Sequence, residues 1–496
     1  MRKLKFKKLL AVLLITLLLF SQLVFADANN NTQSFNSDFI KSIVDMIKST
    51  YNGDVTDNQL LQGIMKGVFG TMDPYTVFYT PDEAKAFLND IGGTIQGIGV
   101  VISKEGDYIT VDKVIPGSPA ERAGITTGDR IVKVDGKSIL GITADQAAKL
   151  ITGQAGTKVS LDIIKIGRNN SISITLGREN VSYNPVTYEI KDGIGYLKLE
   201  IFNSNAYAGV KTALDAFDKA GIKKVVLDLR DNPGGEVDQA VAIAREFIPK
   251  GLITSLRFKS DKLQDIDYYS YLETPRYKLS VLVNGNSASA SEIFAGAVQD
   301  TAAGTLIGTK TFGKAKVQNL FPILTPEAYE KYESQLGVKI VNVYDLYGYG
   351  IIPTDDEILG WVKMTTGMYT TPKGRMIDLV GINPDIQVKD PTPANGIDVK
   401  SIQKLTAANK FKLNDNSTDI YNAERIMKAL GYFSGTPGYT LDKNASAAVS
   451  KFQKAVGGYP YGVLDLTTQR QLNKKLEELN RKTDMQYSKA VEILNK

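Results

Sequence analysis

The chain has 496 residues, an ordinary apolar content of 43% and a formal net charge of +5, and it contains neither histidine nor cysteine. These two absences exclude a Ser-His-Asp triad, a catalytic thiol, a disulfide framework and any zinc site built on His or Cys. Covalent or acid–base chemistry is therefore left to carboxylates, Lys, Tyr, Ser and Thr. The length predicts roughly three domains.

Residues 1–26 are typical of an export signal. Small residues, Val24 and Ala26, stand at the positions that a signal peptidase prefers. An apolar stretch precedes them, behind a cationic start formed by Arg2, Lys3, Lys5, Lys7 and Lys8. The open alternative is an uncleaved membrane anchor, because the stretch from Leu9 to Ala26 approaches the shortest length that spans a bilayer. Either way, we expect an exported protein that is extracytoplasmic, membrane-anchored or cell-wall-associated.

The positive net charge comes from this leader. Residues 1–26 carry five cations and no anion, so the formal charge of the remaining chain is zero. Attraction of nucleic acid requires an excess or a cluster of cations. The composition therefore predicts no nucleic-acid partner.

Residues 27–92 are predicted to form a helical arm. Phe39, Ile43 and Ile47 recur at helical spacing, and further helices are expected over residues 57–70 and 82–89.

Residues 93–180 favour β-structure, because their apolar runs are rich in β-branched residues. A short helix is expected over residues 119–123 and a longer one over 143–151, and Asp135-Gly136 indicates a hairpin turn. The predicted strands cover residues 100–102, 108–114, 130–134 and 159–166.

Strands and helices alternate over residues 181–390, which predicts an α/β core. Residues 325–357 resemble an insertion ahead of a strand at 360–365, and they could form a lid, a substrate ledge or a subunit contact. The expected strands are 194–201, 224–229 and 279–283, and the expected helices are 206–220, 236–248 and 289–299.

The chain after the core is predicted to be a linker over 391–414, a helical unit over 415–482 and a charged, frayed tail over 483–496. Helices are expected at 420–430, 445–455 and 467–480. The fold class is therefore multidomain α+β: a helical N-terminal arm, a β-rich domain, an α/β core and a small three-helix C-terminal domain.

A serine-rich string follows the predicted strand 279–283. Residues Asn286-Ser287-Ala288-Ser289-Ala290-Ser291 join that strand to the next helix. A serine at such a turn faces the positive end of the helix dipole beside free backbone N–H groups, which suits an acyl-transfer nucleophile. The open alternative is that Ser287 or Ser289 only caps the helix.

A glycine turn, Arg230-Asp231-Asn232-Pro233-Gly234-Gly235, follows the predicted strand 224–229. Pro-Gly at its centre fits a type II turn. Gly235 has no side chain that would keep a carbonyl oxygen away from its backbone N–H. Taken alone, the string also fits an ordinary strand–helix turn.

A serine nucleophile in this chain needs a base other than histidine. Lys314 has apolar neighbours, and no acidic residue occurs between Lys310 and Leu324. A lysine acts as a base only when neutral, so burial must lower its pKa from about 10.4, at a cost of roughly 3–4 kcal/mol. The Gln318 amide could hydrogen-bond the neutral amine and orient it. An exposed lysine is the alternative, since lysine is seldom buried.

Several strings occur together in the order found in the C-terminal processing (tail-specific) serine peptidases, which the sequence resembles over residues 37–390. They are Gly97 to Val100, Leu227 to Gly235, Ser287 to Asp300, Thr311 to Gln318 and Tyr369 to Val388. The resemblance implies Ser289 as nucleophile, Lys314 as base and Gln318 as the group that orients the lysine. It also implies the backbone N–H groups of Gly235 and Ala290 as oxyanion donors, and no metal or organic cofactor. Ala315 departs mildly from the family, where glycine is commoner.

Residues 93–180 resemble the PDZ module of these peptidases, on the strings Pro119 to Gly124, Gly128 to Ile131 and Val134 to Gly136. A peptide tail would lie between the strand that begins at Val100 and the helix 143–151. Consecutive N–H groups would receive its carboxylate. The expected carboxylate loop is Gly97, Ile98 and Gly99, and the expected side-chain pocket is Ala147, Leu150 and Ile151.

Residues 415–482 resemble the three-helix peptidoglycan-binding module of cell-wall enzymes. The strings are Ala429 to Phe433, Ala448 to Gln453 and Gly462 to Asp465. The alternative is a generic helical packing or dimerisation domain. The resemblances together imply protein C-terminal tails, peptidoglycan and a second copy of the chain as partners.

We therefore expect an exported serine endopeptidase that cleaves proteins near their C-termini. The rival hypothesis is a non-catalytic PDZ and cell-wall scaffold, which the loss of Ser289 or Lys314 would favour, and both are present. A penicillin-binding type of enzyme is disfavoured, because the one S-x-x-K string, Ser401 to Lys404, has no S-D-N or K-T-G beside it. The chain also has no D-T-G or D-S-G string for an aspartic peptidase.

Overall fold

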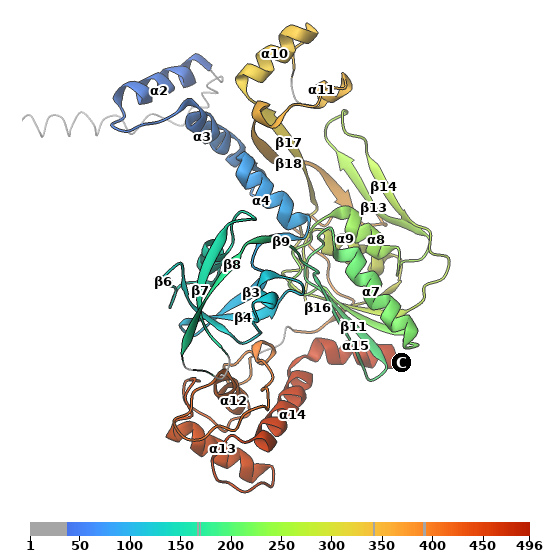
Figure 1. Ribbon diagram of the computed structural model, residues 1–496. Helices are drawn as coiled ribbons and strands as arrows, with labels where there is room; N and C mark the ends of the chain where they lie inside the picture. The colour runs from blue at the N-terminus through green and yellow to red at the C-terminus, as the bar shows by residue number, and fades with distance from the viewer. Residues whose placement is uncertain (1–36, 166–167, 169, 341–342, 390–392) are drawn as a thin grey trace, which may run out of the picture. The chain divides into compact units, whose positions relative to one another are not determined.

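A computed structural model describes residues 37–165, 168, 170–340, 343–389 and 393–496 (Figure 1). The leader expected over residues 1–26 lies outside the described residues. The chain divides into two compact units, residues 1–65 and residues 66–496. No helix within the described residues has both the length and the apolar character needed to cross a bilayer.

The predicted arm is helical and consists of α2 (Ser37–Thr50), α3 (Asp57–Gly70) and α4 (Pro81–Ile91). Helix α2, in the first unit, buries none of its residues. Helix α4 begins at a capping box, in which the Thr80 hydroxyl accepts the Glu83 N–H and the Glu83 carboxylate accepts the Thr80 N–H. This cap explains why the helix starts directly after Thr80.

The β-rich domain has one six-stranded sheet in the order β3-β4-β5-β7-β8, with β6 paired to β5. Helices α5 (Pro119–Arg122) and α6 (Ala144–Ile151) were both predicted, and Asp135-Gly136 forms the expected hairpin, with φ of 48° and 75°. The strands are β3 (Val100–Glu105), β4 (Tyr108–Val114), β5 (Arg130–Val134), β6 (Lys137–Ser138), β7 (Lys158–Ile164) and β8 (Ser171–Gly177). The ends of the domain are joined by pairing of β2 (Thr94–Gly97) with β9 (Glu179–Ser182).

The α/β core is built on a sheet in the order β10-β11-β12-β15-β16-β19, parallel except for the edge strand β10. Val225 and Leu227 contribute to the main apolar core, whereas Val226 points to the opposite face. The main core contains residues of α7 (Ala206–Lys219), α8 (Val237–Ala244) and α9 (Ala290–Asp300). The strands are β10 (Val186–Lys191), β11 (Ile194–Leu199), β12 (Lys224–Asp228), β15 (Lys278–Val283), β16 (Gly304–Gly308) and β19 (Ile386–Gln387).

A second sheet stands beside the first and carries the predicted insertion. Its order is β1-β18-β13-β14, with β17 also paired to β18. The insertion joins β17 to β18 and contains α10 (Pro326–Leu336), α11 (Val343–Gly348) and the 3-10 helix η1 (Asp355–Glu357), packed around an apolar cluster of its own. The strands are β1 (Val77–Tyr79), β13 (Gly251–Phe258), β14 (Ile266–Ser270), β17 (Lys316–Leu324) and β18 (Ile358–Thr370).

The C-terminal region contains the three predicted helices, α12 (Thr418–Ala429), α13 (Lys443–Ala455) and α14 (Leu466–Thr483), after a short 3-10 helix, η2 (Val399–Ser401). These helices surround their own apolar core. The domain also packs on the β-rich domain, where Arg425 pairs with Glu105 at 3.3 Å and the Tyr439 ring lies 4.3 Å from the Arg130 guanidinium.

The expectation of a frayed, charged tail is wrong. Residues Met485–Asn495 form a fourth helix, α15, whose Ala490 and Leu494 are buried against the second face of the central sheet (Figure 1). Parallel sheets are stable when both faces are covered. Helix α15 therefore completes the core of the α/β domain, although it follows the C-terminal domain in the chain.

Candidate active site

Ser289 stands at the junction of strand β15 and helix α9 in a strained backbone conformation. Its φ and ψ are 56° and −116°, which residues other than glycine rarely adopt. Its backbone N–H donates to Glu292 Oε2 at 3.0 Å. Within the described residues, the Ser289 hydroxyl donates no hydrogen bond. The strain presents this hydroxyl at the N-terminus of α9, where a nucleophile gains from the helix dipole.

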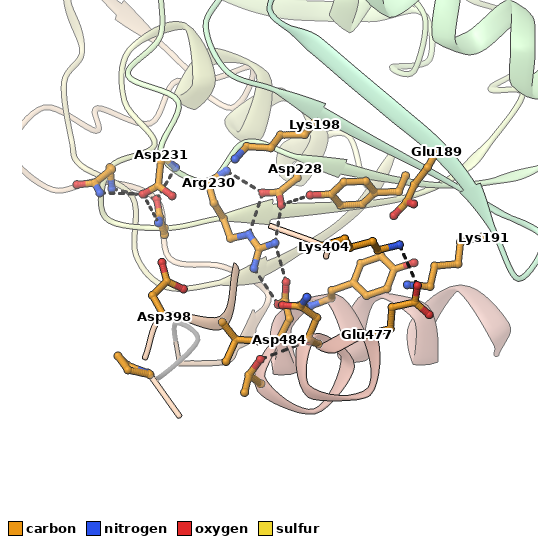
Figure 2. A pocket seen from close by; sticks show the side chains of 18 of the residues that line it. Glu189, Lys191, Lys198, Asp228, Arg230, Asp231, Asp398, Lys404, Glu477 and Asp484 are labelled. Carbon is orange, nitrogen blue, oxygen red and sulfur yellow. Dashed lines mark hydrogen bonds and ion pairs between the residues drawn. The ribbon is translucent and has the colours of Figure 1, made fainter. Parts of the chain in front are cut away.

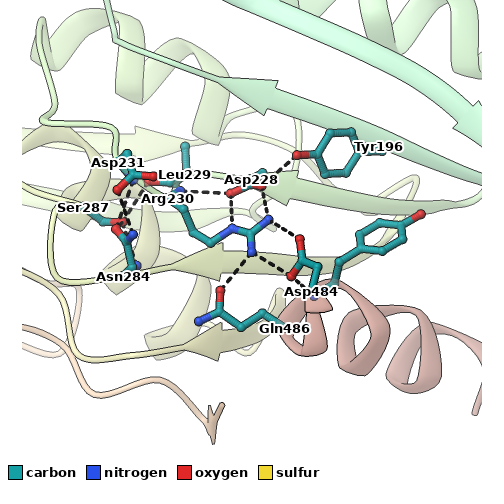
Figure 3. A network of polar contacts seen from close by, with 10 residues as sticks. Tyr196, Asp228, Leu229, Arg230, Asp231, Asn284, Ser287, Asp484 and Gln486 are labelled. Carbon is teal, nitrogen blue, oxygen red and sulfur yellow. Dashed lines mark hydrogen bonds and ion pairs between the residues drawn. The ribbon is translucent and has the colours of Figure 1, made fainter. Parts of the chain in front are cut away.

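The two neighbouring serines have structural roles. Ser287 Oγ donates to the Leu229 carbonyl at 2.8 Å, and Ser291 Oγ donates to the Asn232 carbonyl at 2.9 Å. Both side chains are fully buried. They fasten the serine-rich string to the strand end and turn of residues 229–232, as Figure 3 shows for Ser287. Of the three serines, Ser289 is the one whose hydroxyl is left for chemistry.

The glycine turn closely approaches the serine. A Cβ atom on Gly234 would lie 2.8 Å from Ser289 Cβ and 2.9 Å from Ala290 N, so a side chain there would collide with the nucleophile segment. The N–H groups of Gly235 and Ala290 have no acceptor in the part of the chain that the structure describes. Unpaired N–H donors on either side of a serine are what an oxyanion hole requires.

Lys314 is a half-buried amine that has no ion pair among the described residues. Its Nζ lies 4.5 Å from the centre of the Tyr75 ring. Burial lowers the pKa of Lys314, the nearby charge of Lys363 lowers it further, and Asp73 and Glu292 oppose the shift. The environment therefore favours the neutral amine that a lysine base must supply.

Glu292 and Tyr369 hold the serine and lysine segments together. The fully buried Glu292 carboxylate accepts the backbone N–H groups of Ser289 at 3.0 Å, Gly313 at 2.8 Å and Lys314 at 2.9 Å. The Tyr369 hydroxyl lies 3.0 Å from the Ser289 carbonyl oxygen and 2.7 Å from that of Lys314. Burial, with the charge of Glu292, raises the pKa of Tyr369 well above its usual value, so the hydroxyl stays a donor.

Sequence reasoning missed these positioning residues. Ser289 and Glu292 have the S-x-x-E spacing of a capping box, a signal that could have identified the glutamate. Tyr75 and Tyr369 come from segments far from both strings; Tyr369 begins one of the strings that resemble the family, but that string gives it no role, and no local pattern marks Tyr75.

Gln318 lies on β17 at a shift in register against β18. Its amide Nε2 donates to Thr365 Oγ1 at 3.3 Å, and within the described residues no hydrogen bond joins it to the Lys314 amine. Its role in orienting the lysine therefore remains a prediction.

The expected peptide-binding loop of the β-rich domain has open donors. The N–H groups of Ile98 and Gly99 have no acceptor in the described portion of the chain, and β3, which follows them, is an edge strand. The three residues expected to line the side-chain pocket differ in their exposure: Ala147 and Ile151 are buried in the domain core, whereas Leu150 is 44% exposed. The loop and the strand edge are thus available to an extended peptide, and the pocket remains a prediction.

The chain is similar to known proteins over most of its length. The profile of peptidase family S41 matches residues 193–388, and a PDZ domain profile matches residues 110–165. The carboxy-terminal processing protease CtpA of Bacillus subtilis is 30% identical over 99% of this chain and 98% of its own length. The carboxy-terminal-processing protease of Bartonella bacilliformis is 31% identical over 76% of this chain and 80% of its own. A solved structure of a photosystem II D1 C-terminal processing protease is 26% identical over 70% of this chain and 87% of its own, with a TM-score of 0.39.

Proposed function

This chain belongs to peptidase family S41, the C-terminal processing serine peptidases, and we propose that Ser289 and Lys314 form its catalytic dyad. The observation that carries the assignment is the shared support of the two residues: Glu292 and Tyr369 bind the backbone of both. The family membership also leaves little support for the rival hypothesis of a non-catalytic scaffold.

The proposed reaction is acyl transfer through the serine. Neutral Lys314 takes the proton of Ser289 as the hydroxyl oxygen bonds to the scissile carbonyl carbon, and the oxyanion that forms accepts the N–H groups of Gly235 and Ala290. The C–N bond then breaks, and the Lys314 ammonium returns the proton to the leaving amine. Water hydrolyses the acyl-enzyme by the same sequence, with Lys314 again as base.

We propose that the substrate is a protein or peptide with a free C-terminal tail. A tail added along β3 would extend the PDZ sheet, and its carboxylate would receive the N–H groups of Ile98 and Gly99. A solved PDZ domain of the Vibrio cholerae carboxy-terminal protease, 29% identical and matched over 18% of this chain, is in complex with a peptide. The cut would then fall near the tail that the PDZ domain holds.

Removing the tail's charge is expected to impair turnover. A peptide with a C-terminal carboxamide should bind the protein about 5- to 150-fold more weakly than the carboxylate form, because a charge-assisted hydrogen bond of roughly 1–3 kcal/mol is lost. Affinity is measured on the Ser289→Ala variant, which does not consume the peptide, and kcat/KM on the wild type. Equal values for the two peptides would show that the domain does not select tails by their carboxylate.

We further propose export and self-association. The cationic and apolar leader supports an extracytoplasmic location, either membrane-anchored or cell-wall-associated. Helix α2 supports a homodimer, because apolar side chains along it, among them Ile40, Ile43 and Met46, are exposed.

Peptidoglycan binding by the C-terminal domain is a second proposal, favoured by one surface feature. Tyr459 is 81% exposed on the loop between α13 and α14, and its ring centre lies 6.0 Å from that of Tyr461. Paired exposed aromatic rings suit the apolar face of a sugar. The buried contacts with the β-rich domain support the rival role of an internal packing domain.

Co-sedimentation of the full-length Ser289→Ala protein with purified peptidoglycan separates these roles. We expect enrichment in the pellet that falls about 2- to 12-fold with Tyr459→Ala, the range for one aromatic contact. Tyr271→Ala, at a tyrosine of the α/β core that is 69% exposed, is the matched control and should leave binding unchanged. No enrichment over a protein of similar charge would leave packing as the role of the domain.

A further inference from the structure

The first residue of the glycine turn carries a guanidinium that is buried and fully hydrogen-bonded. Arg230 is 5% exposed. Its Nε donates to Asp228 Oδ1 at 2.8 Å and its Nη2 to Asp228 Oδ2. Its Nη1 donates to Asp484 Oδ1 at 2.8 Å and to Gln486 Oε1 at 3.0 Å, and its Nη2 also reaches Asp484 Oδ2 at 3.0 Å. All five donors of the side chain are thereby used, as Figure 3 shows.

Three of these five acceptor atoms come from a distant part of the chain. Asp228 ends strand β12 two residues before Arg230, whereas Asp484 lies 254 residues after it, at the start of α15. Asp484 is held by its own helix, because its carboxylate accepts the Tyr487 N–H. Gln486 is held by the core, because it donates to the Val388 carbonyl at 3.0 Å. The acceptors therefore stand in place independently of the arginine.

The guanidinium of Arg230 is buried among charged and polar groups. Two carboxylates face one guanidinium, and Tyr196 donates to the carboxylate of Asp228 at 2.7 Å. A cleft of about 950 Å³ runs alongside, lined by the core sheet and by residues of the C-terminal region such as Lys404 and Glu477 (Figure 2). Removal of Asp484 leaves the Asp228–Arg230 pair intact but takes two of the five acceptor atoms from the guanidinium. Buried N–H donors without an acceptor are costly, so the Nη groups of Arg230 would shift toward water in this cleft.

The backbone that follows Arg230 has little freedom to absorb such a movement. Asp231 has a positive φ of 64°, and its N–H donates to Asn284 Oδ1 at 3.0 Å. Three residues later, Gly234 packs against Ser289, and Gly235 presents the proposed oxyanion N–H. The guanidinium and the oxyanion donor thus lie at opposite ends of one short, strained turn.

We propose that Asp484 is a positioning residue for catalysis, which acts through Arg230 to hold the 230–235 turn and its Gly235 N–H in place. The N-cap of helix α15 would then support the active site through the Arg230 side chain. This inference rests on the proposed function, since it assumes that Ser289 attacks and that Gly235 receives the oxyanion.

Asp484→Ala should lower kcat about 10- to 300-fold and leave KM nearly unchanged, because a displaced oxyanion donor should cost no more than the ~10²–10³-fold that follows its complete loss. Asp484→Asn, which still caps α15, should show a smaller loss of the same kind. Glu492→Gln is the matched control, because Glu492 lies on the same helix and, among the residues that the structure describes, forms ion pairs only with Lys489 and Lys496 at the surface. It should behave as the wild type.

A second readout separates positioning from stability. A peptide aldehyde forms a tetrahedral adduct with the serine and requires the oxyanion donors, whereas the matching peptide alcohol only binds. The ratio of their inhibition constants, measured per titrated active site, should move toward unity in both Asp484 variants in parallel with kcat. An unchanged ratio, with fewer titratable sites, would reduce Asp484 to a structural role, and wild-type kinetics would overturn the inference. Ser289→Ala that retained activity would instead refute the proposed dyad.

Discussion

Ser289→Ala is expected to abolish hydrolysis of tail peptides, with a fall in kcat of at least about 10⁴-fold, because the proposed covalent intermediate cannot form. The fold should survive, since the hydroxyl donates no hydrogen bond within the described residues and alanine keeps the Cβ that Gly234 packs against. The measurement is steady-state hydrolysis of a fluorogenic peptide, alongside the thermal midpoint of the variant.

The flanking serines supply the matched controls. Ser287→Ala and Ser291→Ala should keep measurable activity but lose stability of about 0.5–1.5 kcal/mol or more each, because each variant loses a buried hydrogen bond to a backbone carbonyl. The pattern is therefore opposite for the central and the outer serines: activity is lost at one and stability at the other two. Turnover by purified Ser289→Ala above trace levels would contradict the assignment.

Local sequence patterns predicted those parts of the fold that local physics determines. The hairpin at Asp135-Gly136 was identified because both residues tolerate positive φ, and the helix over 57–70 was predicted to the residue. The domain order and the family also followed from strings of consecutive residues. These features need no knowledge of what packs against them.

The errors and omissions depend on tertiary contacts. Residues 483–496 carry charges on a weakly apolar segment, which predicts a frayed tail, yet Ala490 and Leu494 are buried against a sheet whose strands lie far earlier in the chain. Tyr75 reaches Lys314 from a segment before β1. The local sequence identifies Arg230 only as the first residue of a turn, because its partner Asp484 is remote in the sequence. No window of sequence contains both members of these contacts.

Lys314 carries the second large effect. Lys314→Arg should be inactive, with a loss in kcat at least comparable to that of a missing general base, about 10²–10⁴-fold, because a guanidinium stays protonated in this pH range. Lys316→Met is the matched control, since Lys316 also lies near the Tyr75 ring, at 5.7 Å, but has Asp73 within 3.9 Å. It should retain activity, and an active arginine variant would exclude the neutral-lysine mechanism.

The direction in which kcat/KM changes with pH also tests Lys314 as the base. Burial, and then the charge of Lys363, lowers the pKa of Lys314, so kcat/KM should rise with pH through a midpoint below the usual lysine value of about 10.4. Lys363→Met removes a repelling cation and should move this midpoint to higher pH.

The lowered pKa of Lys314 also reduces the stability of the fold. At a pH between the lowered and the usual pKa, the unfolded chain binds a proton on Lys314 that the folded chain does not. Lys314 therefore destabilises the fold most at lower pH and progressively less as the pH rises through that interval. Lys314→Met should therefore be inactive yet more stable than the wild type at neutral pH, as thermal unfolding across pH would measure. A midpoint unmoved by Lys363→Met would show that the rise in activity reports a group other than Lys314.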